Sequence, residues 1–237
     1  MEIPIKTEKE IKIMKEGGKI LAGIFDELVK MVEVGLDVMV LENKFIDLCH
    51  ENKVRPACKE YSMPGFPPFP SGLCISLNDE AVHCFPVKGK VIADGDLLTI
   101  DTVIEHEGMY LDSAITVGVG NISQKDKKML ETVKKALYES IGVIKPGEMT
   151  GLISHTMFKI VSEQGYSVLQ EYAGHGIGKE MHEPPEIPCY GNPEDGYEIK
   201  PGMAFAIEPL VCENNNLLDH NNYWETKTLD EGKFVQF

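Results

Sequence analysis

The first thirty residues carry apolar side chains at the spacing of one helix face. After Thr7 these positions recur every three or four residues, which is the period of an amphipathic α-helix. Thr7 and Glu10 form a capping-box pattern, in which each side chain bonds the backbone N–H of the other. The apolar stripe consists of Ile11, Met14, Leu21, Phe25, Leu28, Val29 and Val32. The pattern predicts a long helix that begins directly after Thr7.

A second helix is predicted after a short break at Val34-Gly35. Asp37 is a suitable N-cap for it, because a carboxylate accepts hydrogen bonds from the free N–H groups of a first helical turn. The apolar positions of this helix are Val40, Leu41, Phe45, Ile46 and Leu48. The chain therefore begins with two helices joined by a turn.

The same arrangement returns in the second half of the chain, from about Ser123 to Gly165, with a break at 145–147. An offset of 112 residues superposes the two helix pairs. It matches Leu21 with Val133, Phe25 with Leu137, Val29 with Ile141, Gly35 with Gly147, Leu41 with Ile153, and Leu48 with Ile160. Apolar matches at helical spacing also arise by chance, so the pattern favours a duplicated half-domain without requiring one.

Four runs between and after the helix pairs are rich in apolar and β-branched residues, as strands are. They are 97–104, 109–119, 167–172 and 203–212, and the first two are predicted to form a hairpin through 106–108. Helix pairs beside mostly antiparallel strands predict an α+β fold in which the helices cover one sheet face. We expect one domain, 1–237, with halves of roughly 1–120 and 121–237 and a site between them.

The composition narrows the classes of function. With 38 acidic against 23 basic side chains the formal net charge is −15, which opposes adhesion to phosphate backbones and anionic lipids. No apolar run approaches the roughly 20 residues of a membrane span, and the first residues lack a secretory pattern. We expect a soluble, cytoplasmic, monomeric protein that binds neither nucleic acid nor membrane. The six cysteines show no C-x-x-C pair, so free thiols are predicted.

Two carboxylates are predicted to face each other on the hairpin. Asp101 lies in a run that is apolar on both sides, and a buried carboxylate requires a cation, a metal or several hydrogen bonds. Asp112, on the neighbouring strand, is close enough to repel it unless a cation or a proton intervenes. A solvated pair or a shared proton is the alternative interpretation of the hairpin taken alone.

A histidine and a third carboxylate extend this set. His175 stands among glycines in 172–178, where the bare backbone lets other groups approach closely, although an incidental histidine in a turn is the simpler interpretation. His182 follows seven residues later, and Glu208 ends an apolar run. Asp, Asp, His and Glu together suit two divalent ions of Mn, Fe, Co or Zn. A metal-activated water is the predicted nucleophile, since no other hydrolase, P-loop or dinucleotide motif is present in the sequence.

These motifs resemble those of the methionine aminopeptidases, which have the pita-bread fold of two pseudo-symmetric halves. The similarity rests on the glycine-flanked His175 with His182 seven residues on, the pair Asp101 and Asp112, and Ile207-Glu208-Pro209. It covers nearly the whole chain, including the run 74–83 that ends in His83.

The resemblance implies a role for each of these residues. Asp101, Asp112, His175 and Glu208 are the implied metal ligands. Glu208 is also the implied base for the attacking water, and His83 and His182 contact the substrate and stabilise developing charge.

The resemblance further implies a methionine pocket made of soft, apolar side chains that suit a thioether. Its residues are Cys58, Tyr61, Phe69, Cys74, Met181 and Trp224, together with His83 and His182. Ordinary core packing is the alternative role for these side chains. The proline-rich stretch 63–70 is longer than in the family, so Phe66 is a second candidate for the place of Phe69. Cys84 also stands where the family has a glycine after His83.

The length of the chain resembles the short bacterial type 1 form, without the long insertion of type 2 or a zinc-binding extension. The sequence ends at Phe237, one residue before the glutamate that bridges both metals in the family. With three carboxylates in place of four, weak binding of the second metal is expected. Because every upstream ligand is present, we expect a truncated version of an active enzyme.

The resemblance implies removal of the initiator methionine from nascent polypeptides with a small second residue, acting on their N-termini at the ribosome. Two alternatives differ in class. One is a related X-Pro peptidase, although those usually carry a further N-terminal domain. The other is a non-catalytic, metal-poor binding protein of the same fold.

Overall fold

The computed structural model describes residues 2–220 and 222–237, and it confirms the first predicted helix. Helix α1 spans Glu8–Met31 and begins at the predicted capping box. The Glu10 N–H donates to Thr7 Oγ1 at 3.3 Å, and the Thr7 N–H donates to Glu10 Oε2 at 2.7 Å. Leu21, Phe25 and Leu28 of the predicted apolar stripe are buried, and so is Ile24 beside them.

The second helix begins one residue later than predicted. Helix α2 spans Met39–Asn52, and its N-cap is Val38, so the assignment of Asp37 as N-cap is wrong. The Asp37 carboxylate nevertheless accepts the Met39 N–H at 2.9 Å and the Gly89 N–H at 2.8 Å. The Asp37 side chain thus accepts a hydrogen bond from a free N–H group at the start of the helix and also binds the loop that contains Gly89.

The second helix pair repeats features of the first. Helix α3 spans Gln124–Gly142 after a capping box at Ser123, and helix α4 spans Gly151–Glu163. Gly35 and Gly147, matched by the 112-residue offset, have φ angles of 93° and 92°. Such positive φ values cost a glycine little. The backbone geometry of the two turns therefore agrees with the repeat in the sequence.

A sheet of four strands forms the first half's strand layer. It consists of β1 (Arg55–Pro56), β2 (Cys74–Leu77), β3 (Leu97–His106) and β4 (Met109–Gly118). The predicted hairpin is confirmed, with β3 and β4 paired from Leu97–Gly118 to His106–Met109. Strands β1 and β2 share the other edge of β3, so β3 is an interior strand of this sheet. Its two faces pack in different clusters: Leu98, Ile100 and Ile104 lie in the core with α1 and α2, whereas Leu97 and Val103 lie in other clusters.

The second half's strands are shorter than predicted. They are β5 (Ser167–Val168), β6 (Ala173–Gly176), β7 (Glu183–Pro188), β8 (Phe205–Ala206), β9 (Leu210–Cys212), β10 (Leu218–His220), β11 (Thr226–Thr228) and β12 (Phe234–Gln236). The run 167–172 is a strand only at its first two residues. The run 203–212 breaks at 207–209, where Pro209 has no N–H to donate to a ladder.

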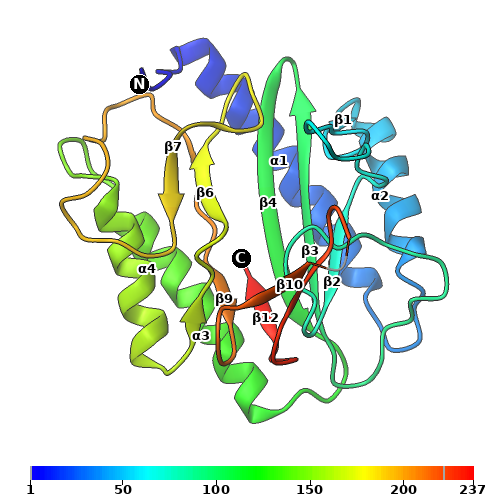
Figure 1. Ribbon diagram of the computed structural model, residues 1–237. Coiled ribbons are helices and arrows are strands. Elements are labelled where there is room, and N and C mark those ends of the chain that lie inside the picture. The colour runs from blue at the N-terminus through cyan, green and yellow to red at the C-terminus, as the bar shows by residue number, and fades with distance from the viewer. Residues whose placement is uncertain (1, 221) are drawn as a thin grey trace.

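Figure 1 shows the strands of both halves facing the viewer, with α1 passing behind β3 and β4, α2 to the right of these strands, and α3 and α4 at the lower left. The first helix pair packs with β2, β3 and β4 in one apolar cluster, and the second pair contributes to another that contains residues of β5, β9 and β12 together with Leu97 of β3. Strand β12 lies between the halves: the Gln236 N–H donates to Thr116 Oγ1 at 3.0 Å, and this hydroxyl donates to the Gln236 carbonyl at 2.7 Å. Among the described residues, no helix has the length and apolarity needed to cross a bilayer.

Candidate metal centre

The hairpin register places Asp101 and Asp112 on the same face of the first sheet. Asp101 pairs with Ala114 and Asp112 pairs with Val103, so the two carboxylates are diagonal neighbours across β3 and β4. Both side chains line one cavity of about 170 Å³. The predicted proximity of the two acids follows from the tight turn at Glu107-Gly108, where both residues have positive φ.

His175 reaches this cavity from β6, in the other half of the chain. Its Nδ1 is 2.8 Å from the Gly176 carbonyl, and that bond directs Nε2 toward the acids. Nε2 lies 3.6 Å from Asp112 Oδ2 and 3.3 Å from Glu208 Oε1. The flanking glycines are required sterically, because a Cβ at Gly174 would lie 2.4 Å from the Ala206 carbonyl oxygen and one at Gly176 would lie 2.3 Å from that of Pro184.

Glu208 occupies the break between β8 and β9. Its backbone carbonyl accepts the Cys189 thiol at 2.9 Å, and its side chain faces His175. Asp112, His175 and Glu208 each offer one ligand atom, and these atoms all lie within 4.8 Å of one another. Asp101 lines the same cavity but lies outside this group of three.

The acids are crowded enough to disturb their protonation. Burial and the charges of Asp112 and Glu208 hold the pKa of Asp101 well above its usual range, although the Gln236 side chain opposes the shift. Burial raises the pKa of Glu208 as well, against the opposing bond from His175. Burial disfavours protonated His175, but bonds to Asp112 and Glu208 outweigh it and raise the pKa of the imidazole to about 10.

These protonation properties indicate that the site needs positive charge. In this cluster the carboxylates have raised pKa values, and the imidazole keeps a proton that balances part of their charge. Both properties are typical of a metal site without its cation. The oxygen-rich donors and single imidazole nitrogen suit Mn, Fe, Co or Zn. The residues present therefore fit divalent metal ions, which would replace these protons.

Two further histidines border the cavity, as expected from the sequence. The His182 ring packs edge-on against that of His175, with centroids 4.5 Å apart, and its Nδ1 lies 3.2 Å from the Tyr61 hydroxyl. His83 has a φ of 59° and packs against Tyr172. Burial lowers the pKa of His83 to about 4 and also lowers that of His182, so both rings are neutral at pH 7.

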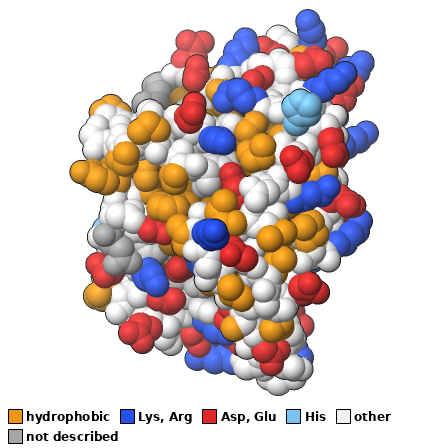
Figure 2. All heavy atoms as spheres, turned by 90° about the vertical axis from the view of Figure 1, so that its right-hand side faces the viewer, with side chains coloured by type: hydrophobic (Ala, Val, Ile, Leu, Met, Phe, Trp, Pro, Cys, Tyr) orange, Lys and Arg blue, Asp and Glu red, His pale blue; other side chains and the backbone are white. Residues whose placement is uncertain are grey.

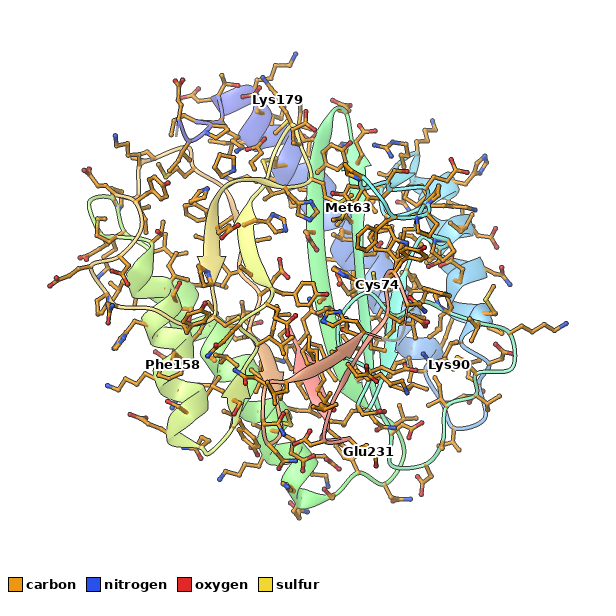
Figure 3. All side chains as sticks on the ribbon, viewed as in Figure 1. Met63, Cys74, Lys90, Phe158, Lys179 and Glu231 are labelled. Atoms are coloured by element: carbon orange, nitrogen blue, oxygen red, sulfur yellow. The ribbon has the colours of Figure 1, made fainter. Side chains whose placement is uncertain are left out.

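The residues predicted for a methionine pocket all line the same cavity: Cys58, Tyr61, Phe69, Cys74, Met181 and Trp224. Figure 3 shows Cys74 beside the β3–β4 hairpin. Phe69 is buried and lies in the cavity wall, whereas Phe66 is exposed and packs against Trp224 with ring centroids 5.1 Å apart. Of the two candidates, Phe69 therefore occupies the pocket position.

Some lining residues were not predicted from the sequence. Met63, Tyr172 and Gln236 also border the cavity. Gln236 comes from β12, which approaches the site only because it pairs with β9. The residues next to Gln236 in the sequence are apolar and form no motif that indicates a binding site. Only the pairing of β12 with β9 identifies Gln236 as a lining residue.

The site combines carboxylates and an imidazole from both halves of the chain with an adjacent pocket of soft apolar side chains. This combination defines a metal-dependent hydrolase. A family model described as metallopeptidase family M24 matches residues 12–233. The chain belongs to this metallopeptidase family.

Its similar relatives are methionine aminopeptidases. Methionine aminopeptidase 1 of Bacillus subtilis (strain 168) is 38% identical over 233 residues, covering 98% of this chain and 92% of that protein. A methionine aminopeptidase of Clostridium acetobutylicum is 33% identical over 229 residues, covering 96% and 90%. The crystal structure of methionine aminopeptidase from Thermotoga maritima superposes with a TM-score of 0.94 at 34% identity, covering 99% and 93%.

More distant neighbours share the fold alone. A prolidase from Pyrococcus furiosus superposes with a TM-score of 0.74 at 23% identity, and the match covers 98% of this chain but 60% of that one. Together these neighbours confirm the predicted α+β pita-bread fold and the resemblance to methionine aminopeptidases.

Proposed function

We propose that this chain removes the N-terminal methionine from polypeptides whose second residue is small, using a metal-activated water. One observation carries the proposal: the cluster of Asp112, His175 and Glu208 opens into the same cavity as a pocket of sulfur and aromatic side chains. An aminopeptidase needs this adjacency, because the bond that it cleaves directly follows the residue that it recognises.

The pocket walls support methionine as that residue. Cys58, Cys74 and Met181 present polarizable sulfur, and Tyr61, Phe69 and Trp224 present ring faces and edges. A thioether is bound favourably by both kinds of group. The wall is closely packed, with Phe69 and Trp224 rings 5.4 Å apart at 88°. A long, unbranched side chain matches such a slot better than a branched or charged one.

In this proposal Asp101, Asp112, His175 and Glu208 hold two divalent ions. Metal ions bound there would acidify a water molecule and polarise the scissile carbonyl. Glu208, whose side chain faces His175 and lines the cavity, would accept the proton of the attacking water. The neutral rings of His83 and His182 orient the substrate, and Tyr61 holds His182 through Nδ1.

The proposed substrates are the N-termini of nascent polypeptides. We propose further that the chain acts as a monomeric, cytoplasmic enzyme with one catalytic domain, 1–237, whose halves meet near residue 120, and that it encounters its substrates close to the ribosome. The surface shown in Figure 2 intermingles acidic and basic side chains, and the net charge of −15 opposes direct binding to RNA.

The test is peptide hydrolysis by chelator-treated protein with and without Mn²⁺ or Co²⁺. We expect metal-dependent release of methionine from Met-Ala-Ser, little from Met-Lys-Ser, and no cleavage of Ala-Pro-Ser. Cleavage of Ala-Pro-Ser in place of Met-Ala-Ser would assign an X-Pro peptidase. Failure to bind either metal in equilibrium dialysis would assign a non-catalytic protein of this fold.

A further inference from the structure

Three exposed apolar side chains lie together next to the cavity. Met63, Phe66 and Tyr223 are 41%, 38% and 62% exposed, and we call them the aromatic shelf. The Phe66 and Tyr223 rings pack edge to face with centroids 5.8 Å apart. Figure 3 places Met63 in front of the β3–β4 hairpin, on the side of the molecule that carries the cavity. Clustered exposed apolar groups commonly mark a binding surface.

The aromatic shelf is continuous with the cavity wall. Met63 lines the cavity while remaining exposed, and the Phe66 N–H donates to the Met63 carbonyl at 3.0 Å. Phe66 also packs on Trp224, which is only 7% exposed and lines the cavity from within. One wall therefore has two sides, with Trp224 and Phe69 inside and Phe66 and Tyr223 outside.

The loop that carries Met63 and Phe66 of the aromatic shelf is held in place and offers few hydrogen-bond donors. Trp224 Nε1 donates to the Pro67 carbonyl at 2.9 Å, and the Phe69 N–H donates to the Tyr61 carbonyl at 2.8 Å. Pro64, Pro67 and Pro68 have no N–H and fixed φ angles. A restrained surface of this kind loses little entropy on binding and favours apolar groups over charged ones.

The occupant follows from where the aromatic shelf begins. In the proposed reaction the cavity holds the first residue of the substrate, and the rest of the peptide must leave past its exposed rim. An extended peptide advances about 3.3 Å per residue. Met63, which lines the cavity and is also exposed, marks the rim on the side of the aromatic shelf.

We propose that the aromatic shelf binds the third and fourth residues of the substrate and favours aromatic or large apolar side chains there. This inference rests on the proposed function. It adds a second level of selectivity. The cavity selects the first residue of the substrate, and the aromatic shelf selects the third and fourth residues.

The experiment compares steady-state kinetics of three peptide amides, Met-Ala-Gly-Gly, Met-Ala-Phe-Gly and Met-Ala-Gly-Phe. For the unaltered protein we expect phenylalanine at the third or fourth position to lower KM about two- to tenfold relative to glycine, as one aromatic contact does. In Phe66→Ala and Tyr223→Ala we expect the ratio of the KM values for the Gly-Gly and phenylalanine peptides to fall toward one.

Two exposed aromatic residues elsewhere provide matched controls. Phe158 is 42% exposed on α4 and Tyr138 is 61% exposed on α3, close to the values for Phe66 and Tyr223. Figure 3 shows Phe158 on the opposite side of the molecule from Met63. Phe158→Ala and Tyr138→Ala should keep the KM ratio of the unaltered protein.

Several results would overturn the inference. Equal KM values for the three peptides in the unaltered protein would do so while leaving the proposed function intact, because methionine is still released. An unchanged KM ratio in both shelf variants, or an equal fall in the controls, would also overturn it. Release of methionine from none of the peptides, with metal present, would instead reject the proposed function.

Discussion

His175 sits where protons and metal ions compete for the same nitrogen. Its Nε2 faces Asp112 and Glu208, and these carboxylates hold the pKa of the metal-free imidazole at about 10. Since a metal binds the neutral ring, metal binding at pH 7 must displace a proton.

We therefore predict that apparent metal affinity increases with pH, by about tenfold per pH unit for each proton displaced below the folded pKa. The shift at Asp101 and Glu208 acts in the same direction, because their raised pKa values also favour the protonated acids. Calorimetric titration with Mn²⁺ in buffers of different ionisation enthalpy counts the protons. His220→Ala, which removes an exposed histidine paired with Glu171, is the control and should show the same count. Zero proton release would contradict the prediction.

His182 gives a second prediction at this scale. Its neutral ring borders the cavity and is held by Tyr61, so it is placed to donate to a developing negative charge. His182→Ala should reduce kcat for Met-Ala-Ser by about 10²- to 10³-fold, as loss of one such donor does. Tyr61→Phe should reduce it less, because the ring remains. A fall in kcat no greater than twofold for His182→Ala would exclude this role.

At the scale of single residues, the sequence is most informative where the chemistry leaves few options. Asp101 between apolar neighbours, and His175 between glycines, are costly arrangements that local sequence makes visible. Gln236 and Met63 were not predicted, because their neighbours in the sequence create no buried charge or other energetically costly arrangement. They reach the cavity through the pairing of β12 with β9 and through the course of a loop.

At the scale of elements, a buried ion pair fixes the turn between β6 and β7. Lys6 Nζ bonds Glu183 Oε2, and both side chains are almost fully buried. Glu183 Oε1 also accepts the Lys179 N–H at 2.7 Å. A Cβ at Gly178 would lie 2.3 Å from Lys6 Cε, so the turn fits around the pair.

Lys6→Met should lower the free energy of unfolding by about 3 to 5 kcal/mol, because it leaves Glu183 buried without its cation. Urea unfolding measures the change. The double variant Lys6→Met, Glu183→Gln should recover part of the loss, since the glutamine carbonyl can still accept the Lys179 N–H. Lys9→Met, at an exposed lysine of α1, should change stability by less than about 0.5 kcal/mol. A similar loss in Lys9→Met would contradict the prediction.

Helices and long strands were predicted from their periodicity, whereas β6 and β7 of the second half were not predicted. Strand β6 consists largely of glycine and strand β7 of proline and glutamate, and neither composition favours a strand by itself. Tertiary contacts create them: β6 pairs on one edge with β7 and on the other with β8. The break at Glu208 was likewise hidden inside an apolar run.

For the whole molecule, the metal cluster joins parts that are distant in the chain. Asp112 belongs to the first helix-and-strand unit, and His175 and Glu208 belong to the second. A ligand that binds only the folded state stabilises it by mass action, by about 2.7 kcal/mol at one hundred times the dissociation constant.

Adding Mn²⁺ at that excess should therefore raise the thermal midpoint of chelator-treated protein by roughly 5 to 11 °C, because 1 kcal/mol shifts the midpoint of a domain of this size by about 2 to 4 °C. Differential scanning fluorimetry measures the shift. Asp112→Asn should abolish most of it, and the matched change Asp195→Asn, in a loop outside the cavity, should leave it intact. An equal shift in Asp112→Asn would show that the metal stabilises the protein elsewhere.

The overall architecture was visible in the sequence as a repeat of helix pairs. The 112-residue offset that matches Gly35 with Gly147 also matches Asp37 with Met149, and each of these two residues forms an isolated β-bridge beside its helix. The repeat does not specify how the halves meet. That depends on β12 and on hydrogen bonds such as those between Thr116 and Gln236, which join residues 120 positions apart.

The position of Trp224 gives this protein a built-in optical reporter. It is the only tryptophan in the chain, so all indole emission originates from the wall between the cavity and the aromatic shelf. Its ring is buried and its N–H is already bonded to Pro67, which leaves emission sensitive mainly to what touches the ring faces. Occupancy of the pocket can therefore be followed in unlabelled protein, in real time and separately from turnover.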